Sequence, residues 1–214
     1  MEKRLFKMAV LLFGVFIVLA APYSFAKEKK ESVKFNHKTV ELQLALRDLW
    51  VGHIFWVRNV VLATKYNDAD AAKVAEGKVV ENAKAIGDAI ASIYGKEAGD
   101  KLFGLLAGHY GAVKDYMTTA FAGNADAKSA AIEKIKKNAE EIASFLSSAN
   151  PNWPKQTLVA LLMAHGAHHI AQIDQVNIKD FAAEAKTSDD MKNHIYVIAD
   201  ALAGGIVKQF PKKF

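Results

Sequence analysis

The chain has 214 residues, of which 51% are hydrophobic and 24% are charged, and its formal net charge is +5. The hydrophobic fraction excludes an intrinsically disordered chain, and the mild charge, with no patch of interleaved basic and aromatic residues, gives no support for nucleic-acid binding. The absence of cysteine excludes a disulfide scaffold, thiolate metal sites, iron–sulfur clusters and cysteine nucleophiles. The length is ample for a domain with a buried core.

The first 26 residues have the three parts of a secretory signal peptide. Basic residues precede an apolar run over 8–21, and small residues, Ser24 and Ala26, stand at −3 and −1 of a cleavage site before Lys27. The apolar run is shorter than the ~20 residues that a membrane-spanning helix needs. We therefore expect cleavage, export to the periplasm or the medium, and no stable membrane span afterwards; an uncleaved anchor is the alternative.

Beyond the signal peptide, apolar residues recur at helical spacing and no strand-like alternation persists, so the fold class is all-α. Residues 27–39 should form an exposed N-terminal tail, and 40–214 a single domain. Turns marked by Asn, Asp, Gly and Pro predict an up-and-down bundle. Six helices are expected, over 40–66, 69–94, 97–122, 125–149, 154–176 and 188–209, with a short extra turn near 180–186.

A search for internal repeats finds one pattern three times. The sequence L-x-x-L-x-x-small-His recurs at a spacing of 56 residues and ends at His53, His109 and His165. Three polar residues on the helices that follow have the same spacing: Asn82, Asn138 and His194. We interpret this as three copies of a 56-residue helical hairpin. Small residues directly before each histidine also suggest close approach by a helix or a bound group.

These six polar residues should lie at one height in the bundle, because positions equidistant from a turn are level in antiparallel helices. Each also falls in the apolar stripe of its helix, so the layer should be buried. Neutral imidazole is a good ligand for Zn, Cu, Fe and Ni. We therefore expect metal ligands at four positions, with two residues that orient them or bridge through water, and two auxiliary residues that could widen the site. The ligands are His53, His109, His165 and His194, the bridging residues are Asn82 and Asn138, and the auxiliary residues are His168 and His169.

Other interpretations of the layer stand beside a bare metal. Haem b held noncovalently by opposite histidines is one, since no CxxCH attachment motif is present. A di-iron carboxylate centre is not expected, because the chain has no Glu-x-x-His motif and no inward carboxylate at this level. The main alternative is a structural or partner-binding helical module whose His/Asn layer is only a buried hydrogen-bond network. An enzyme or an organic-ligand site comes third, and a homo-oligomer is compatible with all of these.

Two stretches carry a resemblance to a known family. Residues 147–154 read SSANPNWP, and the C-terminus has the pattern GI-x-x-QFP-x-KF. Over about 40–214 the chain resembles a family of small bacterial all-helical proteins. Members of that family are sometimes labelled glycosyltransferase or acetylglutamate kinase, but no nucleotide or sugar motif in this chain supports either activity. The resemblance therefore implies the helical fold and supplies no mechanism.

Overall fold

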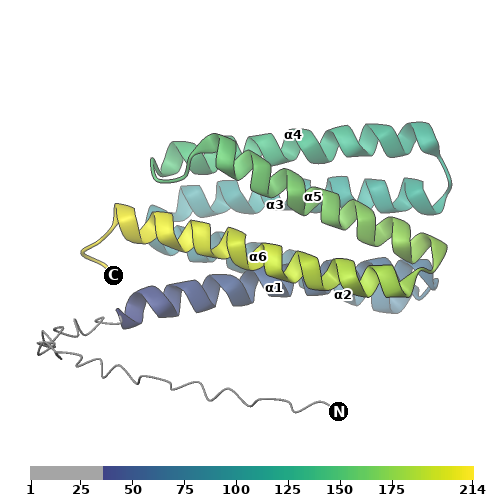
Figure 1. Cartoon of the computed structure of the whole chain (residues 1–214), viewed down its shortest axis with the longest axis horizontal. Helices are drawn as coiled ribbons and strands as arrows, with labels where there is room; N and C mark the ends of the chain where they lie inside the picture. Colours follow the sequence, from purple (N-terminus) through teal and green to yellow (C-terminus); the bar gives the residue numbers. More distant parts are fainter. Residues whose placement is uncertain (1–35) are drawn as a thin grey trace, which may run out of the picture. The chain divides into compact units, whose positions relative to one another are not determined.

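The computed structural model describes residues 36–214, so the predicted signal peptide, its cleavage site and most of the predicted tail lie outside the described residues. Over 36–214 the chain folds into α-helices and contains no strand, which confirms the predicted all-helical bundle (Figure 1). The helices are α1 (His37–Lys65), α2 (Ala69–Tyr94), α3 (Lys96–Phe121), α4 (Ala125–Ala149), α5 (Lys155–Ile178) and α6 (Phe181–Gln209). None of them combines the length and the apolar character of a membrane-spanning segment.

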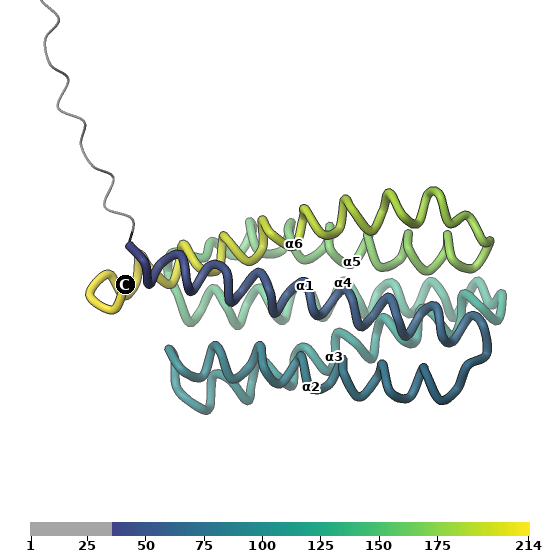
Figure 2. Tube along the Cα trace, turned by 90° about the horizontal axis from the view of Figure 1, so that it is seen from below, coloured from purple at the N-terminus to yellow at the C-terminus, as the bar shows by residue number. Residues whose placement is uncertain are grey.

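The six helices lie along one common axis, and consecutive helices run in opposite directions (Figure 2). Consecutive helices pack side by side, and α6 closes the bundle by packing against α1. Each even-numbered helix lies against two odd-numbered ones: α2 against α1 and α3, α4 against α3 and α5, and α6 against α5 and α1. Helix α5 also contacts α1 and α3 directly. One face of each of the helices α1, α3 and α5 therefore points into the interior of the bundle.

Three of the connections have the same local structure, and they fall at the predicted turns. In α1–α2, α3–α4 and α5–α6, one residue with a left-handed backbone is followed by an Asp or Asn that caps the next helix. The capping side chain accepts a hydrogen bond of 2.9–3.0 Å from the N–H three residues later. The left-handed residues are Asn67 (φ 57°), Gly123 (φ 69°) and Lys179 (φ 62°), and the caps are Asp68, Asn124 and Asp180.

Helix α6 begins earlier than predicted. The expected helix over 188–209 and the separate turn near 180–186 are one continuous helix that starts at Phe181. Asp180 caps its first turn, and Glu184 is buried within it, at 1% exposure. The prediction was wrong because this segment is held by polar contacts and lacks a regular apolar stripe. Helix α1 likewise begins at His37, so the last three residues of the predicted tail are helical.

The apolar core consists of two clusters of buried side chains at different heights in the bundle. On α1, Trp50 and Ile54 belong to the first cluster and Val57 to the second. On α3, Leu106 belongs to the first cluster and Val113 to the second. The buried histidines of these helices stand at the boundary between the two clusters. A polar layer therefore interrupts the core near the middle of the bundle.

Candidate metal centre

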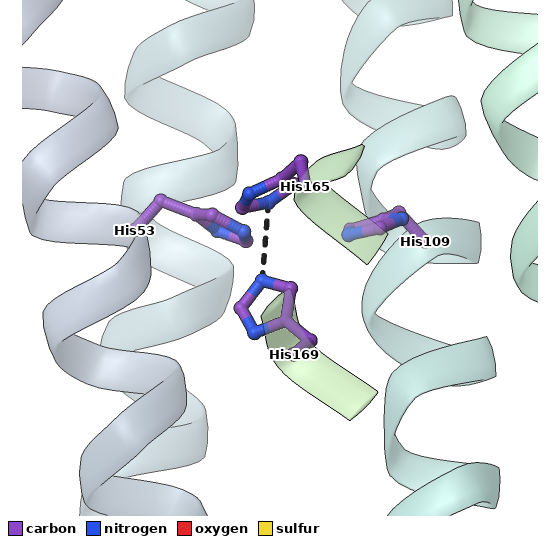
Figure 3. Close-up of side chains that lie close together, drawn as sticks. All are labelled: His53, His109, His165 and His169. Atoms are coloured by element: carbon purple, nitrogen blue, oxygen red, sulfur yellow. Dashed lines mark hydrogen bonds between the residues drawn. The ribbon is translucent and has the colours of Figure 1, made fainter. Parts of the chain in front are cut away.

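Four buried histidines from three helices meet at this boundary (Figure 3). His53 comes from α1, His109 from α3, and both His165 and His169 come from α5. One ring nitrogen from each lies within 4.8 Å of the other three. The side chains are between 1% and 5% exposed, and their ring centroids are 4.4–6.0 Å apart. We call these four residues the His cluster.

Helix geometry explains how α5 supplies two members of the His cluster. Residues four apart lie on the same face of a helix, one turn from each other, so His165 and His169 point into the same space. Their Nε2 atoms are 3.0 Å apart and share a hydrogen bond (Figure 3). The other two helices contribute one imidazole each, from opposite sides of this pair.

The His cluster does not satisfy its own hydrogen-bonding groups. Apart from the His165–His169 contact, its buried nitrogens find no partner within residues 36–214. The unpaired atoms are His53 Nε2, His109 Nδ1 and Nε2, His165 Nδ1 and His169 Nδ1. Leaving a buried polar atom unpaired costs about 1–3 kcal/mol. The cluster as it stands is therefore an expensive arrangement for a purely structural element.

All four imidazoles are held in the neutral form. Burial is the main cause, and it lowers the pKa of His53 to about 3 and that of His109 to about 4. The pKa values of His165 and His169 are also driven well below the ordinary range, first by burial and then by repulsion from neighbouring imidazoles. A neutral imidazole keeps a lone pair on one ring nitrogen, which is the form that binds a metal ion.

Three of the predicted polar residues, Asn82, Asn138 and His194, make hydrogen bonds between helices. Asn82 Nδ2 donates to the carbonyl of Leu49 at 2.9 Å, and Asn138 Nδ2 donates to Leu105 at 3.0 Å. On α6, His194 Nε2 donates to the carbonyl of Leu161 at 2.9 Å. In each case the acceptor lies four residues before a histidine of the His cluster. These three bonds join each even-numbered helix to the preceding helix close to the level of the cluster.

Three of the four predicted ligands therefore converge, and the fourth position is taken by a different residue. His194 lies outside the His cluster, and its ring contacts that of His168 instead, with centroids 5.2 Å apart. His169, expected only as an auxiliary residue, completes the group. The repeat could not identify His169, because valines occupy the matching positions. Its i,i+4 spacing from His165 was the available signal.

Glycines before two of the histidines allow the close approach that the sequence suggested. A Cβ at Gly52 would lie 2.9 Å from Asn82 Nδ2, and one at Gly108 would lie 3.3 Å from Asn138 Nδ2. The approaching groups are thus the two amides that donate to the Leu49 and Leu105 carbonyls. The small residues make room for hydrogen bonds between helices.

A buried carboxylate lies near the start of α6. Glu184 accepts hydrogen bonds from Arg58 Nε at 2.6 Å, from Gln172 Nε2 at 3.1 Å and from Ser188 Oγ at 2.8 Å. The Arg58 guanidinium is the main reason that the pKa of Glu184 lies below its usual range. Glu184 belongs to the segment expected to be a separate turn, which is why the sequence did not reveal it. It is not one of the four clustered side chains.

Comparisons with known proteins add no assignment: no family model, no curated protein and no solved structure matches the chain. The resemblance carried by SSANPNWP and the C-terminal pattern stays a prediction. The site is therefore interpreted from its own chemistry.

Proposed function

We propose that the protein binds a transition-metal ion through the four imidazoles of the His cluster. The observation that carries this proposal is the convergence of four neutral, buried rings, with one nitrogen of each within 4.8 Å of the other three and most of the buried ring nitrogens unpaired among residues 36–214. A metal ion accepts lone pairs from all four at once. It also relieves part of the hydrogen-bonding deficit, since each nitrogen that binds the ion no longer needs a donor.

The main alternative, a hydrogen-bond network that only fixes helix pairing, describes other residues better. Asn82, Asn138 and His194 each make an interhelical bond to a carbonyl, as a structural layer should. The four cluster histidines share a single hydrogen bond among them. Two kinds of polar residue thus occupy the middle of the bundle: an outer set that links helices and an inner set that is suited to a ligand.

The chemistry of the four imidazole ligands indicates which metal or cofactor the His cluster would bind. Four imidazoles without thiolate or carboxylate suit Zn, Cu, Fe or Ni, with Zn favoured where four ligands complete a tetrahedron. Haem is less suited, because rings 4.4–6.0 Å apart occupy the space that a porphyrin would need. Four protein ligands also leave no open position of the kind catalytic zinc sites keep. We therefore propose metal buffering, sensing or carriage in preference to catalysis.

We further propose that the bundle consists of three copies of one hairpin. Supporting this, the helix caps Asp68, Asn124 and Asp180 are spaced by 56 residues, as are the left-handed residues that precede them. The bonds from Asn82, Asn138 and His194 to leucine carbonyls have the same spacing. On this account each copy supplies one imidazole, and the third adds His169.

A melting experiment tests the metal proposal. The untagged protein, stripped with a chelator, is melted with and without an excess of Zn²⁺, Cu²⁺, Ni²⁺ or Fe²⁺. At a free metal concentration about 100 times its Kd, we expect a gain of ~2.7 kcal/mol in the free energy of unfolding. His109→Ala should lose the gain. A melting temperature unaffected by all four metals would refute the proposal.

Export remains a separate proposal, supported by the charged, apolar and small-residue segments of 1–26. The test is to express the full chain in a bacterial host and sequence the N-terminus of the exported product. We expect it to begin at Lys27. Retention of Met1 in a membrane fraction would favour the uncleaved anchor.

A further inference from the structure

One consequence of metal binding concerns the protons of the His165–His169 pair. Their Nε2 atoms are 3.0 Å apart and hydrogen-bonded, so one of these nitrogens carries a proton. If both Nε2 atoms are to bind a metal, both must offer lone pairs, and both ring protons must then sit on Nδ1. The Nδ1 atom of His169 becomes an N–H donor. That atom is buried and has no acceptor among the described residues.

A buried acceptor without a donor stands one turn away on the same helix. Gln172 is 1% exposed, and its Oε1 is unpaired among residues 36–214. Its Nε2 donates to Glu184 Oε1 at 3.1 Å and to Ser188 Oγ at 2.9 Å. Because a carboxylate can only accept, the amide nitrogen must face α6, and this fixes Oε1 on the other side of the group. Residues three apart on a helix are neighbours, so the side chains that carry the unpaired Gln172 Oε1 and the unpaired His169 Nδ1 are neighbours on α5.

Resting on the proposed function, we infer that Gln172 is the positioning residue for the metal ligand His169, accepting the Nδ1 proton of that ring when Nε2 binds the ion. An outer partner of this kind fixes the tautomer and the orientation of a ligating imidazole and raises its basicity. The Glu184 carboxylate strengthens the effect, because it polarises the Gln172 amide and leaves Oε1 a better acceptor. Arg58 in turn holds Glu184 through two hydrogen bonds, of 2.6 and 2.7 Å.

The pattern of the sequence supports a link between Gln172 and His169. Positions 56 and 112 residues before His169 hold valines, and those before Gln172 hold Tyr116 and Val60. The fourth imidazole and the buried amide therefore occur together, in the last hairpin alone. An outer partner is needed only where the additional ligand is present.

The test compares two substitutions that separate positioning from packing. Gln172→Met keeps the side-chain volume and removes the acceptor, whereas Gln172→Glu keeps an acceptor oxygen but places a second carboxylate beside Glu184. Each variant is stripped, then titrated with Co²⁺ in competition with a chelator, and the visible Co²⁺ spectrum is recorded. The stability of the stripped protein is measured in urea. Gln175→Met is the matched control, since Gln175 lies six residues beyond His169.

We expect the two variants to rank in opposite order for Co²⁺ affinity and for the stability of the stripped protein. Gln172→Met should weaken Co²⁺ binding about 10–100-fold and alter the spectrum, while Gln172→Glu should bind Co²⁺ more tightly than the Met variant does. In stripped protein, the Glu variant should be the less stable of the two, because it brings like charges together. If stripped Gln172→Glu does not fold, the Met variant and its control still decide the question.

Two results would overturn the inference in distinguishable ways. If wild type binds Co²⁺ and Gln172→Met has the same affinity and spectrum, Gln172 does not position His169 and the metal proposal stands. If wild type binds neither Co²⁺ nor any of Zn²⁺, Cu²⁺, Ni²⁺ and Fe²⁺, the metal proposal itself fails and the role of Gln172 fails with it.

Discussion

The Nε2 atoms of His165 and His169 are 3.0 Å apart, one helical turn from each other on α5. Two neutral rings can make this contact only if one donates and the other accepts. The rings of His53 and His109 close around the pair, and Nε2 of the first and both ring nitrogens of the second have no partner in the described part of the chain. Each neutral ring has one N–H and one lone pair, so the pair lies at the centre of an arrangement with several unused lone pairs, and a metal ion is the kind of group that would accept them.

The first prediction tests which residue is the fourth ligand: His169, which belongs to the His cluster, or His194, which the 56-residue pattern indicated. His169→Ala should weaken metal binding by more than the ~10–100-fold that loss of an outer partner causes, because it removes a ligand. His194→Ala should leave the metal affinity within about twofold of wild type and cost about 0.5–1.5 kcal/mol of stability, since it removes the interhelical hydrogen bond to the Leu161 carbonyl, which keeps its helical bond within α5. Zinc competition titrations and urea unfolding measure the two effects. The reverse assignment of effects would show that His194 is the fourth ligand.

The second prediction concerns the stability of the protein at acidic pH. The pKa of His53 falls from 6.5 to about 3 on folding, and that of His109 from 6.5 to about 4. The unfolded chain therefore binds more protons than the folded one below pH 6.5, so stability is complete above that pH and falls as the pH drops. Each of these histidines should remove ~1.4 kcal/mol per pH unit in this window.

The measurement for this prediction is urea unfolding of the metal-free protein between pH 7.5 and 5, a range in which carboxylates contribute little. His109→Leu removes one of the titrating groups, so its stability should decline less steeply with falling pH than that of wild type. A wild-type stability that is flat from pH 6.5 to 5 would mean that the imidazoles are not buried in neutral form.

The third prediction concerns the links between helices. Asn138→Leu removes the amide that donates to the Leu105 carbonyl, and that carbonyl keeps its helical bond within α3. The expected cost is the net contribution of one hydrogen bond, about 0.5–1.5 kcal/mol in the free energy of unfolding, with metal affinity close to that of wild type. Urea unfolding and a zinc competition titration measure these two quantities. Loss of zinc binding in a variant that remains folded would place Asn138 in the metal site itself.

The fourth prediction uses glycines in two different environments. Replacing an exposed helical glycine by alanine usually stabilises a helix by ~1 kcal/mol, and we expect about this gain for Gly104→Ala, where a Cβ meets nothing within 4 Å. Gly52→Ala should instead be destabilising, because its Cβ would lie 2.9 Å from Asn82 Nδ2 and displace that amide. Thermal melting of both variants checks the contrast. Equal stabilisation by both would show that Asn82 does not approach α1 as described.

The sequence predicts the fold more completely than the site, and particular residues show why. Helix ends depend on local chemistry, so the caps Asp68 and Asn124 are visible in the sequence. The 56-residue spacing likewise identifies His53, His109 and His165, which end the same sequence pattern. Neither argument identifies His169 or Glu184. His169 has valines at the matching positions of the 56-residue pattern. Glu184 is buried by partners on α1 and α5 that no local pattern reveals.

The count of metal ions per chain tests the central claim most directly. Untagged protein is stripped, incubated with excess Zn²⁺, freed of unbound metal by gel filtration and measured by elemental analysis beside His169→Ala treated identically. The account predicts one zinc per wild-type chain and essentially none on the variant. Absence of zinc from the wild type, or an equal content in both proteins, would contradict it.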